Sequence, residues 1–332
     1  MVVDSGSGYR LKMITCCEKT IKIYIDEPVR EVKELTGGHI NRSFLVKAGS
    51  TYVLQSLNPC LYSAALKDIE YNYMQYKSAC ELYDAGTYEW YCPEWIKNRE
   101  GNFFYLDEDG NIWRMYRYIE GSVFDKEESK TGLYEVGKGL GRLHRILNEC
   151  DGIREPGAFS HLHDIDYYYK KYLNLNVPDK YKRIDGLDRI IRDRIEEMRA
   201  VKVPTESAIH ADAKTGNMVF RNGKVVCFID TDSIMPGSVY DDLADCARSC
   251  CTYENGDTDR EKLTSLLEGY EDGCKNRHIR VDMGLLIKYI AKNRFLLGIR
   301  YYSDHLSGEG YFAERYSGQN VEKAGKLLNS FL

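Results

Sequence analysis

"IHADAKTGNMVFRNGKVVCFIDTDS", which spans residues 209–233, decides the fold because it sets polar side chains around a predicted hairpin. Residues 218–220 and 225–229 are β-prone runs, and the pair Asn222-Gly223 stands between them. Asn-Gly between apolar runs is the strongest short-range signal for a two-residue hairpin turn. The segment is therefore expected to form two antiparallel strands with polar residues at their open end.

The turn also fixes which residues are expected to lie opposite one another. Counting back from the turn pairs Asn217 with Phe228, and Asp230 follows two residues later. Adjacent strands lie about 4.8 Å apart and rise about 3.4 Å per residue, so Asn217 and Asp230 would emerge within reach of one ion. An amide oxygen with a carboxylate suits Mg²⁺, whereas Zn²⁺ prefers Cys and His.

Asp212 lies five residues before Asn217, in the loop that enters the hairpin. A carboxylate beside a metal–phosphate site can orient a substrate hydroxyl and accept its proton. The order His-x-Asp, four residues, Asn, hairpin and Asp is thus typical of phosphoryl transfer. The alternative is a chance set of turn residues, since Asp and Asn are common in turns. Five polar residues in register around one hairpin argue against that alternative.

Composition narrows the class of protein further. The chain has 332 residues, a formal net charge of −5 spread along its length, and 11 cysteines without a C-x-x-C pair. About two domains or lobes are expected, and the lack of basic patches argues against a nucleic-acid partner. No apolar run approaches the roughly 20 residues of a membrane span, and the N-terminus lacks a signal-peptide core. We expect a cytoplasmic protein with reduced core thiols and no membrane partner, while the oligomeric state stays open.

Strand-like patterns dominate the first hundred or so residues, and helical patterns dominate the rest. We expect an α+β protein with two lobes: residues 1–118 form a small antiparallel sheet with one helix, and residues 119–332 form a mainly helical lobe. The join near 118–121 is expected to be the hinge. The expected strands of the first lobe are 31–35, 43–47, 51–57, 102–106 and 111–120, and its helix is 62–83. The expected helices of the second lobe are 129–148, 164–173, 185–200, 240–251, 258–273, 281–303 and 321–331.

Several stretches resemble a known family. "HADAKTGN…IDTD" is similar to the catalytic loop and metal-binding segment of the aminoglycoside phosphotransferase and choline kinase superfamily, which has the protein-kinase-like fold. "GKGLGRLH" (137–144) resembles the helix before that loop, and "YDDLADCAR" (240–248) resembles the helix after it. Within the superfamily the closest resemblance is to N-acetylhexosamine 1-kinases. It is found in "GGHIN" (37–41), "YVLQSLN" (52–58), "WRMYRYIEG" (113–121), "IDTDSIMPGSVYDD" (229–242) and "GIRYYSDHLSGEGYF" (298–312).

The resemblance implies an activity and a role for each residue of the hairpin segment. It implies ATP- and Mg²⁺-dependent phosphorylation of the anomeric hydroxyl of N-acetylglucosamine or N-acetylgalactosamine, without choosing between them. Asp212 would be the catalytic base, and Asn217 and Asp230 would hold Mg²⁺. Three further residues would support the site: His210 as a brace of the catalytic loop, Asp232 near the metal, and Asp242 as a helix cap that also bonds the loop backbone.

The resemblance also implies where the nucleotide and the sugar bind. The glycine pair of "TGGHIN" would cover the nucleotide phosphates, and the backbone of 116–119 would bond adenine. The nucleotide-binding candidates are Gly37, Gly38, Gln55, Tyr116 and Tyr118. The substrate-binding candidates are His39, Asp212, Arg300, Asp304 and Tyr311. For Arg300 the alternative is an exposed charge at a helix end.

One position departs from the usual kinase pattern. Gln55 stands where relatives have the third-strand Lys, so the expected ion pair with Glu70 cannot form and the grip on the phosphates is unexplained. Lys47 or Lys67 could substitute, and the sequence does not decide between them. There is no Walker A motif, and no Arg follows His210, which argues against a P-loop enzyme and a protein kinase.

Three functions remain in competition. The first is a kinase of the anomeric hydroxyl of an N-acetylhexosamine. The second is a kinase of the same fold that acts on another small alcohol, such as another sugar, an aminoglycoside or choline. The third is a catalytically silent nucleotide-binding scaffold, which Gln55 favours and the intact Asp212, Asn217 and Asp230 disfavour.

Overall fold

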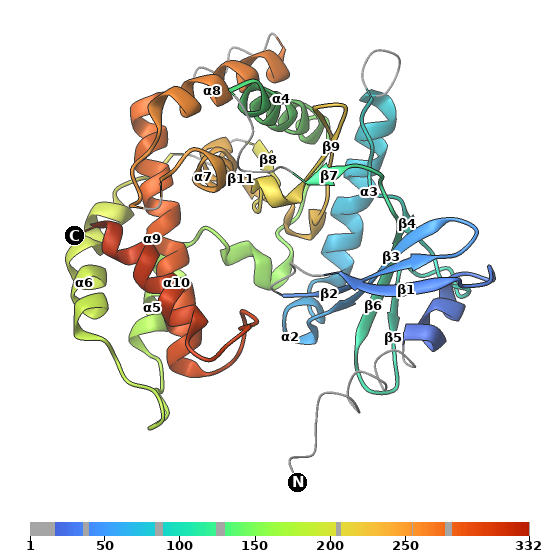
Figure 1. Cartoon of the computed structure of the whole chain (residues 1–332), viewed down its shortest axis with the longest axis horizontal. Helices are drawn as coiled ribbons and strands as arrows, with labels where there is room; N and C mark the ends of the chain where they lie inside the picture. Colours follow the sequence, from blue (N-terminus) through green and yellow to red (C-terminus); the bar gives the residue numbers. More distant parts are fainter. Residues whose placement is uncertain are drawn as a thin grey trace. The chain divides into compact units, whose positions relative to one another are not determined.

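A computed structural model describes residues 17–35, 40–83, 89–123, 130–203, 207–253, 255–275 and 281–331 (Figure 1). Its strands are β1 Glu31–Leu35, β2 Arg42–Lys47, β3 Thr51–Leu57, β4 Trp95–Ile96, β5 Phe104–Leu106, β6 Ile112–Arg117, β7 Ser122–Val123, β8 Ser207–Ile209, β9 Met218–Arg221, β10 Lys224–Phe228 and β11 Met235–Gly237. Its α-helices are α2 Pro59–Tyr62, α3 Leu66–Tyr83, α4 Lys130–Leu147, α5 Ile165–Leu173, α6 Asp185–Arg199, α7 Val239–Cys250, α8 Arg260–Cys274, α9 Met283–Ser307 and α10 Gln319–Leu328. Four 3₁₀ turns accompany them: η1 Gly157–His161, η2 Thr215–Asn217, η3 Thr231–Ser233 and η4 Asn329–Phe331.

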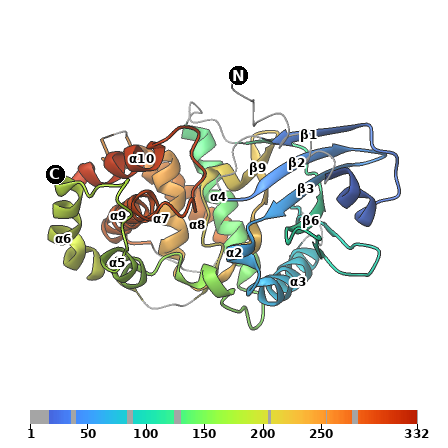
Figure 2. The same ribbon diagram turned by 90° about the horizontal axis from the view of Figure 1, so that it is seen from below.

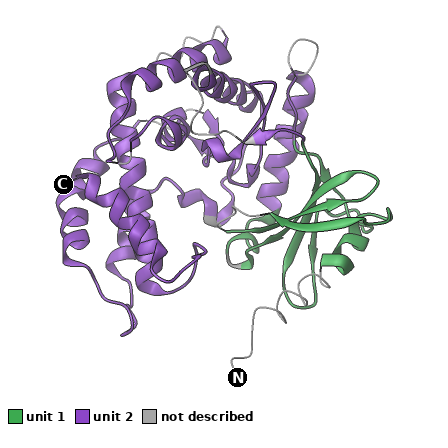
Figure 3. Cartoon of the chain, viewed as in Figure 1, with its two compact units in different colours: residues 1–66, 93–119 green, residues 67–92, 120–332 purple. Residues whose placement is uncertain are grey.

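The chain divides into two compact units, coloured green and purple in Figure 3. The smaller unit holds Met1–Leu66 and Pro93–Ile119, and the larger unit holds Lys67–Cys92 and Glu120–Leu332. The chain passes between the units after Leu66, Cys92 and Ile119, and the hinge near 118–121 stays a prediction. In the described part of the chain no helix is long and apolar enough to span a membrane, and a cytoplasmic location stays a prediction.

The smaller unit contains an antiparallel sheet whose strand order differs from the order along the chain. Its described strands follow the order β1-β2-β3-β6-β4, and β5 pairs with β6. Residues 17–24 are helical, which the sequence did not predict, and Cys17, Ile21 and Tyr24 pack on one face of the sheet. Tyr52 and Leu54 of β3 point into that core, so the alternate residues Val53 and Gln55 lie on the opposite face.

Helix α3 packs with the larger unit, although the sequence prediction placed this helix in the first lobe. Tyr76, Ala79 and Cys80 of α3 belong to the main hydrophobic core of the larger unit. Asn72 of the same helix donates to the carbonyl oxygens of Arg154 and Ile234 at 2.8 Å. The boundaries 1–118 and 119–332 remain a prediction about lobes, while α3 is held by contacts of the second part of the chain.

Helices α4 and α8 meet backbone to backbone through four glycines, and they lie side by side in Figures 1 and 2. A Cβ at Gly137 would lie 1.8 Å from the Leu266 carbonyl oxygen, and a Cβ at Gly269 would lie 1.9 Å from the Tyr134 carbonyl oxygen. Each helix repeats the glycine one turn later, at Gly141 and Gly273. Glycine is required at these positions because no side chain fits between the two backbones.

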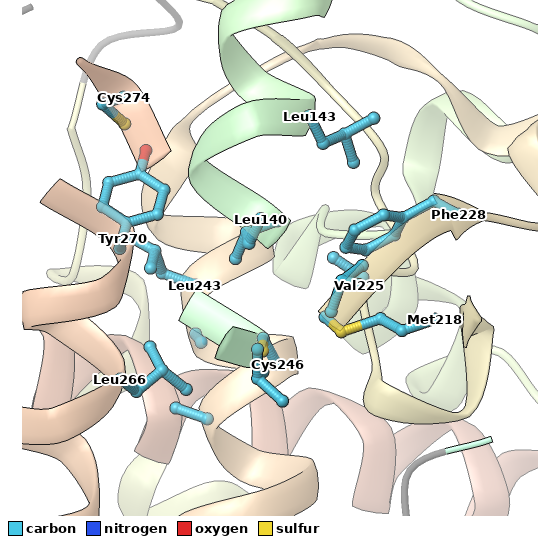
Figure 4. Packing of buried hydrophobic residues seen from close by; sticks show 14 of the residues in the cluster. Leu140, Leu143, Met218, Val225, Phe228, Leu243, Cys246, Leu266, Tyr270 and Cys274 are labelled. Carbon is cyan, nitrogen blue, oxygen red and sulfur yellow. The ribbon is translucent and has the colours of Figure 1, made fainter. Parts of the chain in front are cut away.

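The main core of the larger unit joins this helix pair to the predicted hairpin (Figure 4). Leu140 and Leu143 of α4 point toward Val225 and Phe228 of the hairpin, and Leu243 of α7 lies in the same cluster. All five side chains are almost fully buried. Burying a side chain of this size stabilises the fold by about 1.5 to 3 kcal/mol. Of these helices α4 packs on β10 of the hairpin, and α7 and α8 contribute side chains to the same core.

A second core lies between α9, α10, α5 and α6. α9 and α10 run side by side in Figures 1 and 2, and Gly298 of α9 accommodates Leu328 of α10 at close range. Phe295 and Ile299 of α9 are fully buried there. This core holds the C-terminal part of α9, which includes Arg300 and Asp304.

The hairpin forms as predicted at its turn and departs from the prediction toward its open end. Asn222 and Gly223 both have positive φ, as a type I′ turn requires, and Arg221 pairs with Lys224. A β-bulge between Val225 and Cys227 then shifts the ladder, so Phe228 pairs with Met218 and not with Asn217. The backbone carbonyl of Asn217 instead accepts from the Ile229 amide at 2.9 Å.

Candidate active site

Two short paired strands deliver the polar residues of the hairpin segment. β8 ends at Ile209, directly before His210, and it pairs with β11, which follows η3. The chain then runs from β8 through η2 into β9, turns, and returns through β10 to Asp230. The loop after β8 and the loop after β10 consequently lie beside each other at the open end of the hairpin.

The backbone of His210 and Ala211 is clamped on both sides by side chains. Asp242 accepts from the His210 amide and from the Ala211 amide, each at 2.7 Å. The Ser233 hydroxyl donates to the His210 carbonyl at 2.7 Å, and His163 Nε2 donates to the Ala211 carbonyl at 3.0 Å. Ala211 has φ of +64°, a conformation that costs a non-glycine residue about 1 to 2 kcal/mol. These four contacts hold the strained backbone in place.

The ring of His210 is used as a brace at both nitrogens. Nε2 donates to the Ile229 carbonyl at 3.1 Å, and Nδ1 accepts from the Asp212 amide at 3.3 Å. The side chain is fully buried and its ring packs against Phe228. With both nitrogens engaged in this way, the ring ties the loop after β8 to the end of β10.

The carboxylate of Asp212 is set by two neighbours. Its Oδ2 accepts from Lys214 Nζ at 2.6 Å and from Asn217 Nδ2 at 2.9 Å. Burial acts to raise the pKa of Asp212, but the charge and hydrogen bond of Lys214, with the Asn217 hydrogen bond, outweigh it and hold the pKa below its ordinary value. The side chain is 32% exposed. Asp212 is thus an ionised, partly accessible carboxylate with fixed orientation.

Asn217 and Asp230 offer oxygen atoms on adjacent chain segments. Nδ2 of Asn217 donates to the carbonyl and the carboxylate of Asp212, at 2.8 and 2.9 Å, so its Oδ1 is the atom left for a cation. Asp230 directly follows Ile229, whose amide bonds Asn217, and it adopts a left-handed conformation with φ of +62°. An amide oxygen and a carboxylate fit Mg²⁺, which completes its shell with waters and phosphate oxygens. Among the described residues no group of three or more His, Cys, Asp or Glu is placed to hold a metal ion.

A buried network supports Asp242 from the helix side. His144 Nε2 donates to Asp242 Oδ2 at 2.9 Å, and the Tyr270 hydroxyl lies 2.8 Å from His144 Nδ1. Burial acts to raise the pKa of Asp242, but the hydrogen bond and charge of His144, with the charge and amide of His210, hold it below the ordinary value. The predicted contact with the loop backbone is present. The predicted helix cap is wrong, because α7 begins at Val239 and Ser238 caps it by accepting from the Tyr240 amide.

Asp232 lies in η3, two residues after Asp230, and its side chain is buried. Its predicted place near the metal stays a prediction.

Arg300 sits in a cage of aromatic rings. Its guanidinium lies 5.0 Å from the Tyr168 ring, 5.8 Å from Tyr311 and 5.5 Å from Phe312. Nη2 donates to the Tyr311 hydroxyl at 3.3 Å, and Nε is buried without a hydrogen-bond partner. Burial acts to lower the pKa of Arg300, whereas Tyr168, Tyr311 and the charge of Asp212 raise it, with a net rise. The aromatic faces stabilise the desolvated cation, and the N–H groups that Tyr311 does not occupy remain as donors.

Asp304, predicted as a substrate contact, forms its hydrogen bonds within the protein. Its side chain is 6% exposed, and its carboxylate accepts from the amides of Tyr311 and Phe312 at 2.6 and 3.1 Å and from Asn320 at 2.9 Å. Its oxygens are thus engaged within the protein. Asp304 fixes the loop that carries Tyr311, which makes it a support for that residue.

Gln55 of the smaller unit is paired with an arginine of the next strand. Its Oε1 accepts from Arg114 Nη2 at 2.6 Å, and its Nε2 donates to the Ser43 hydroxyl at 3.2 Å. Arg114 is 2% exposed and lies 4.4 Å over the Trp95 ring. Lys47, one of the substitutes considered for the missing lysine, instead pairs with Glu31 at 2.8 Å.

The remaining predicted nucleotide and sugar residues fall into two groups. Gly37, Gly38 and His39 lie outside the described residues. Tyr116 belongs to β6, and Tyr118 follows that strand, where its amide donates to the Thr51 carbonyl at 3.0 Å.

Sequence reasoning missed four residues that support the loop: Lys214, Ser233 and His163 bond it directly, and His144 bonds Asp242. Lys214 had a signal, because it stands two residues after Asp212 in the predicted loop. His144 and His163 had none beyond their residue type, since their contacts join segments far apart in the chain.

Comparison with known proteins adds the family. The model of the phosphotransferase enzyme family (APH) matches residues 31–274. Among solved structures, the chain is similar to spectinomycin phosphotransferase APH(9)-Ia in complex with ADP and spectinomycin, with 15% identity, 94% of this chain and 93% of that chain covered, and a TM-score of 0.61. It is similar to amicoumacin kinase hAmiN in complex with AMP-PNP, Ca²⁺ and Ami, with 12% identity, 96% and 92% covered, and a TM-score of 0.67. The GDP and kanamycin complex of APH(2″)-IIia gives 12% identity, 95% and 98% covered, and a TM-score of 0.64.

At these identities the structures establish the fold. It is the predicted kinase-like fold, with an antiparallel sheet in the N-terminal lobe and a helical C-terminal part.

Proposed function

The chain belongs to the phosphotransferase enzyme family, and on that premise we propose that it transfers the γ-phosphoryl group of ATP to the anomeric hydroxyl of an N-acetylhexosamine. The coarser statement, a phosphotransferase that acts on a hydroxyl group of a small molecule, follows from the family. The observation that supports the proposed chemistry is the Asp212 carboxylate, oriented by Lys214 and Asn217 on a clamped loop.

Asp212 is the catalytic base in this proposal. A carboxylate with a lowered pKa is ionised at neutral pH and can accept a proton as the hydroxyl attacks. Its partly exposed side chain is accessible to a hydroxyl, while Lys214 and Asn217 prevent it from rotating away. Because phosphoryl transfer depends mainly on positioning and on stabilising charge, fixing this group is a large part of what the protein has to do.

Asn217 Oδ1 and Asp230 are the ligands we propose for Mg²⁺. When bound, Mg²⁺ neutralises charge on the nucleotide phosphates during transfer. Asn217 would have two roles, because its Nδ2 orients Asp212 while its Oδ1 would be the atom that binds the cation. The nearby Lys214 carries a positive charge beside Asp212 and Asp230, and its pKa is raised because both carboxylates outweigh the effect of burial. We propose that Lys214 is a further cation toward the nucleotide phosphates.

For the nucleotide we propose that Gln55 replaces the usual lysine as a donor to phosphate oxygen. Its carbonyl oxygen is taken by Arg114 and one N–H is directed to Ser43, so the other N–H is available for a ligand. Arg114 supplies a full positive charge directly behind the amide. The pair therefore presents the neutral amide of Gln55 to the phosphates with the Arg114 cation next to it, at the position where relatives present the third-strand lysine. Gly37, Gly38 and the backbone at Tyr116 and Tyr118 stay predicted nucleotide contacts.

For the substrate, the caged Arg300 favours a neutral sugar that carries a carbonyl group. Its N–H groups that Tyr311 does not occupy suit an acceptor oxygen such as that of an N-acetyl group, and Tyr311 adds a hydroxyl and an aromatic face. A polycationic aminoglycoside would instead need acidic side chains, and Asp304 is engaged within the protein. His39 remains a predicted sugar contact.

The second candidate is a kinase of another small alcohol. It is favoured by the solved structures, whose own substrates include spectinomycin and kanamycin. A silent scaffold is disfavoured by the fixed geometry of Asp212 and Asn217.

The test is a panel of N-acetylglucosamine, N-acetylgalactosamine, the plain hexoses, kanamycin and choline with MgATP or MgGTP. ADP or GDP release identifies the acceptor and the nucleotide, and phosphorus NMR of the product identifies the phosphorylated position. An anomeric phosphate on an N-acetylhexosamine supports the proposal. Turnover with kanamycin or choline alone would replace it by the second candidate, and release no faster than with water would favour the scaffold.

A further inference from the structure

We propose that His163 is a positioning residue for Asp212, acting by holding the peptide bond that joins Ala211 to Asp212. The inference rests on the proposed function in one respect, namely that Asp212 is the base. The sequence analysis assigned His163 no role, and it lies 48 positions before Ala211 in the chain.

The two ends of this peptide bond are held by two different histidines. The Ala211 carbonyl accepts from His163 Nε2 at 3.0 Å, and the Asp212 amide donates to His210 Nδ1 at 3.3 Å. The orientation of a peptide plane fixes the direction in which the next side chain leaves the backbone. His163 and His210 together therefore set where the Asp212 carboxylate starts.

The held backbone is one that does not keep its conformation by itself. Ala211 has φ of +64°, which only glycine adopts without penalty. Asp242 secures its amide side and His163 secures its carbonyl side. If the carbonyl contact is removed, the residue gains a route to relax toward negative φ, and the plane before Asp212 turns with it.

His163 is itself fixed by packing. Its neighbour Leu162 contacts the small cluster of Ile209, Ala211 and Met235, and the side chain of His163 is only 16% exposed. Nδ1 lies 4.0 Å from Asp241 Oδ1. The ring is thus wedged between the loop and the start of α7, so Nε2 has little freedom to leave the carbonyl.

His163 also stands at a junction between the base and the substrate side. Asp164, the next residue, caps α5, and Tyr168 of that helix covers the Arg300 guanidinium at 5.0 Å. One short segment thus contacts the catalytic loop at one end and the aromatic cage at the other.

The experiment compares His163→Ala, His163→Gln, Ala211→Gly and the double variant His163→Ala/Ala211→Gly. Gln can direct its Nε2 to the same carbonyl, so it serves as the matched conservative control. Kinetics with the acceptor found active in the panel give kcat and KM for MgATP. Hydrogen exchange of the amides of 209–213 is measured without substrate, and thermal unfolding reports global stability.

The proposal expects His163→Ala to lower kcat about tenfold, with KM for MgATP nearly unchanged and faster exchange at Asp212. His163→Gln should recover most of the activity. Ala211→Gly should cost less in the His163→Ala background than in the wild type, because glycine keeps positive φ without the contact.

Wild-type kcat and exchange in His163→Ala would overturn the proposal. A loss of kcat that only accompanies a lower melting temperature, and that neither His163→Gln nor Ala211→Gly relieves, would also overturn the proposal. The proposed function fails separately, if Asp212→Asn remains active. Normal exchange in His163→Ala together with an inactive Asp212→Asn would remove the positioning role alone.

Discussion

The side-chain amide nitrogen of Asn217 lies 2.9 Å from Oδ2 of Asp212, so one hydrogen bond joins the proposed metal ligand to the proposed base. This contact determines how Asn217 is turned. With Nδ2 directed to Asp212, the opposite face of the amide presents Oδ1, which is the atom that a hard cation binds. The same hydrogen bond therefore orients the proposed base and turns Asn217 Oδ1 toward the side where a cation would bind.

Asp212→Asn tests the base. The variant keeps the size of the side chain and can still accept from Lys214 through its amide oxygen, so folding and nucleotide affinity should change little. Without a carboxylate to take the proton, kcat should fall by about 10² to 10⁴-fold. Initial rates of ADP release and the dissociation constant of MgADP measure the two effects, with the exposed Asp166→Asn as control. Turnover within a factor of a few of the wild type would exclude Asp212 as the base.

Lys214→Met tests the electrostatics of the same carboxylate. Lys214 holds the pKa of Asp212 below its ordinary value against the opposing effect of burial, so its removal should raise that pKa. A base works only when ionised, and the acid limb of kcat/KM should therefore move to higher pH in the variant. A pH profile of kcat/KM measures the shift, and Lys214→Arg, which retains the charge, should leave the limb nearly in place. A limb at the same pH in Lys214→Met and in the wild type would contradict the assignment.

The sequence predicted the hairpin turn and the residues of its open end, because Asn-Gly turn chemistry and strand pairing are local. The bulge after Val225 was not predictable in this way, since Val226 and Cys227 are buried and the Val226 carbonyl accepts from the Tyr91 amide, a partner far away in the chain. Lone histidines carry no local signal, which is why His144 and His163 were missed although they support the loop. Their partners, Asp242 and Ala211, lie 98 and 48 positions away in the chain.

The glycines of α4 and α8 present a different case. They repeat at four-residue spacing, at 137 and 141 and again at 269 and 273, and this spacing is visible in the sequence. The sequence does not show that these glycines pack against each other, because the contact requires the two helices to lie side by side. In the structure the close packing sets His144 of α4 beside Tyr270 of α8, and thereby sets the support of Asp242.

Gln55 and Arg114 can be tested by exchanging the charge. Arg114→Gln removes the cation behind the Gln55 amide, and we expect nucleotide affinity to fall about tenfold. Adding Gln55→Lys restores a cation on the same face of the sheet and should recover most of the affinity. The dissociation constant of MgADP measures both changes. Thermal unfolding of each variant shows whether the loss of the buried Arg114 destabilises the fold as a whole. Equal affinity in the single and double variants would argue against a role of this pair in phosphate binding.

Asp242→Asn tests the clamp on the catalytic loop. The carboxylate accepts three hydrogen bonds, and an amide would turn a donor toward a donor, so we expect a loss of stability of about 3 kcal/mol at neutral pH. The pKa of Asp242 is lowered in the folded state, and such a group contributes stability above the ordinary aspartate pKa that is lost as the pH falls through the folded value. The difference between wild type and variant should therefore narrow below about pH 4. Urea unfolding at several pH values measures it, and a difference independent of pH would contradict the assigned charge.

Gly269→Ala tests the contact between α4 and α8. Its Cβ would lie 1.9 Å from the Tyr134 carbonyl oxygen, so the helices must separate, at a cost of about 3 kcal/mol. Gly186→Ala is the matched control, because a Cβ on this glycine of α6 meets nothing within 4 Å and alanine is the better helix former. The first variant should lower the urea midpoint and the second should leave it unchanged or raise it slightly. Since His144 moves with α4, Gly269→Ala should also lower kcat under conditions where the variant remains folded. Full stability in Gly269→Ala would mean that the two helices do not pack backbone to backbone.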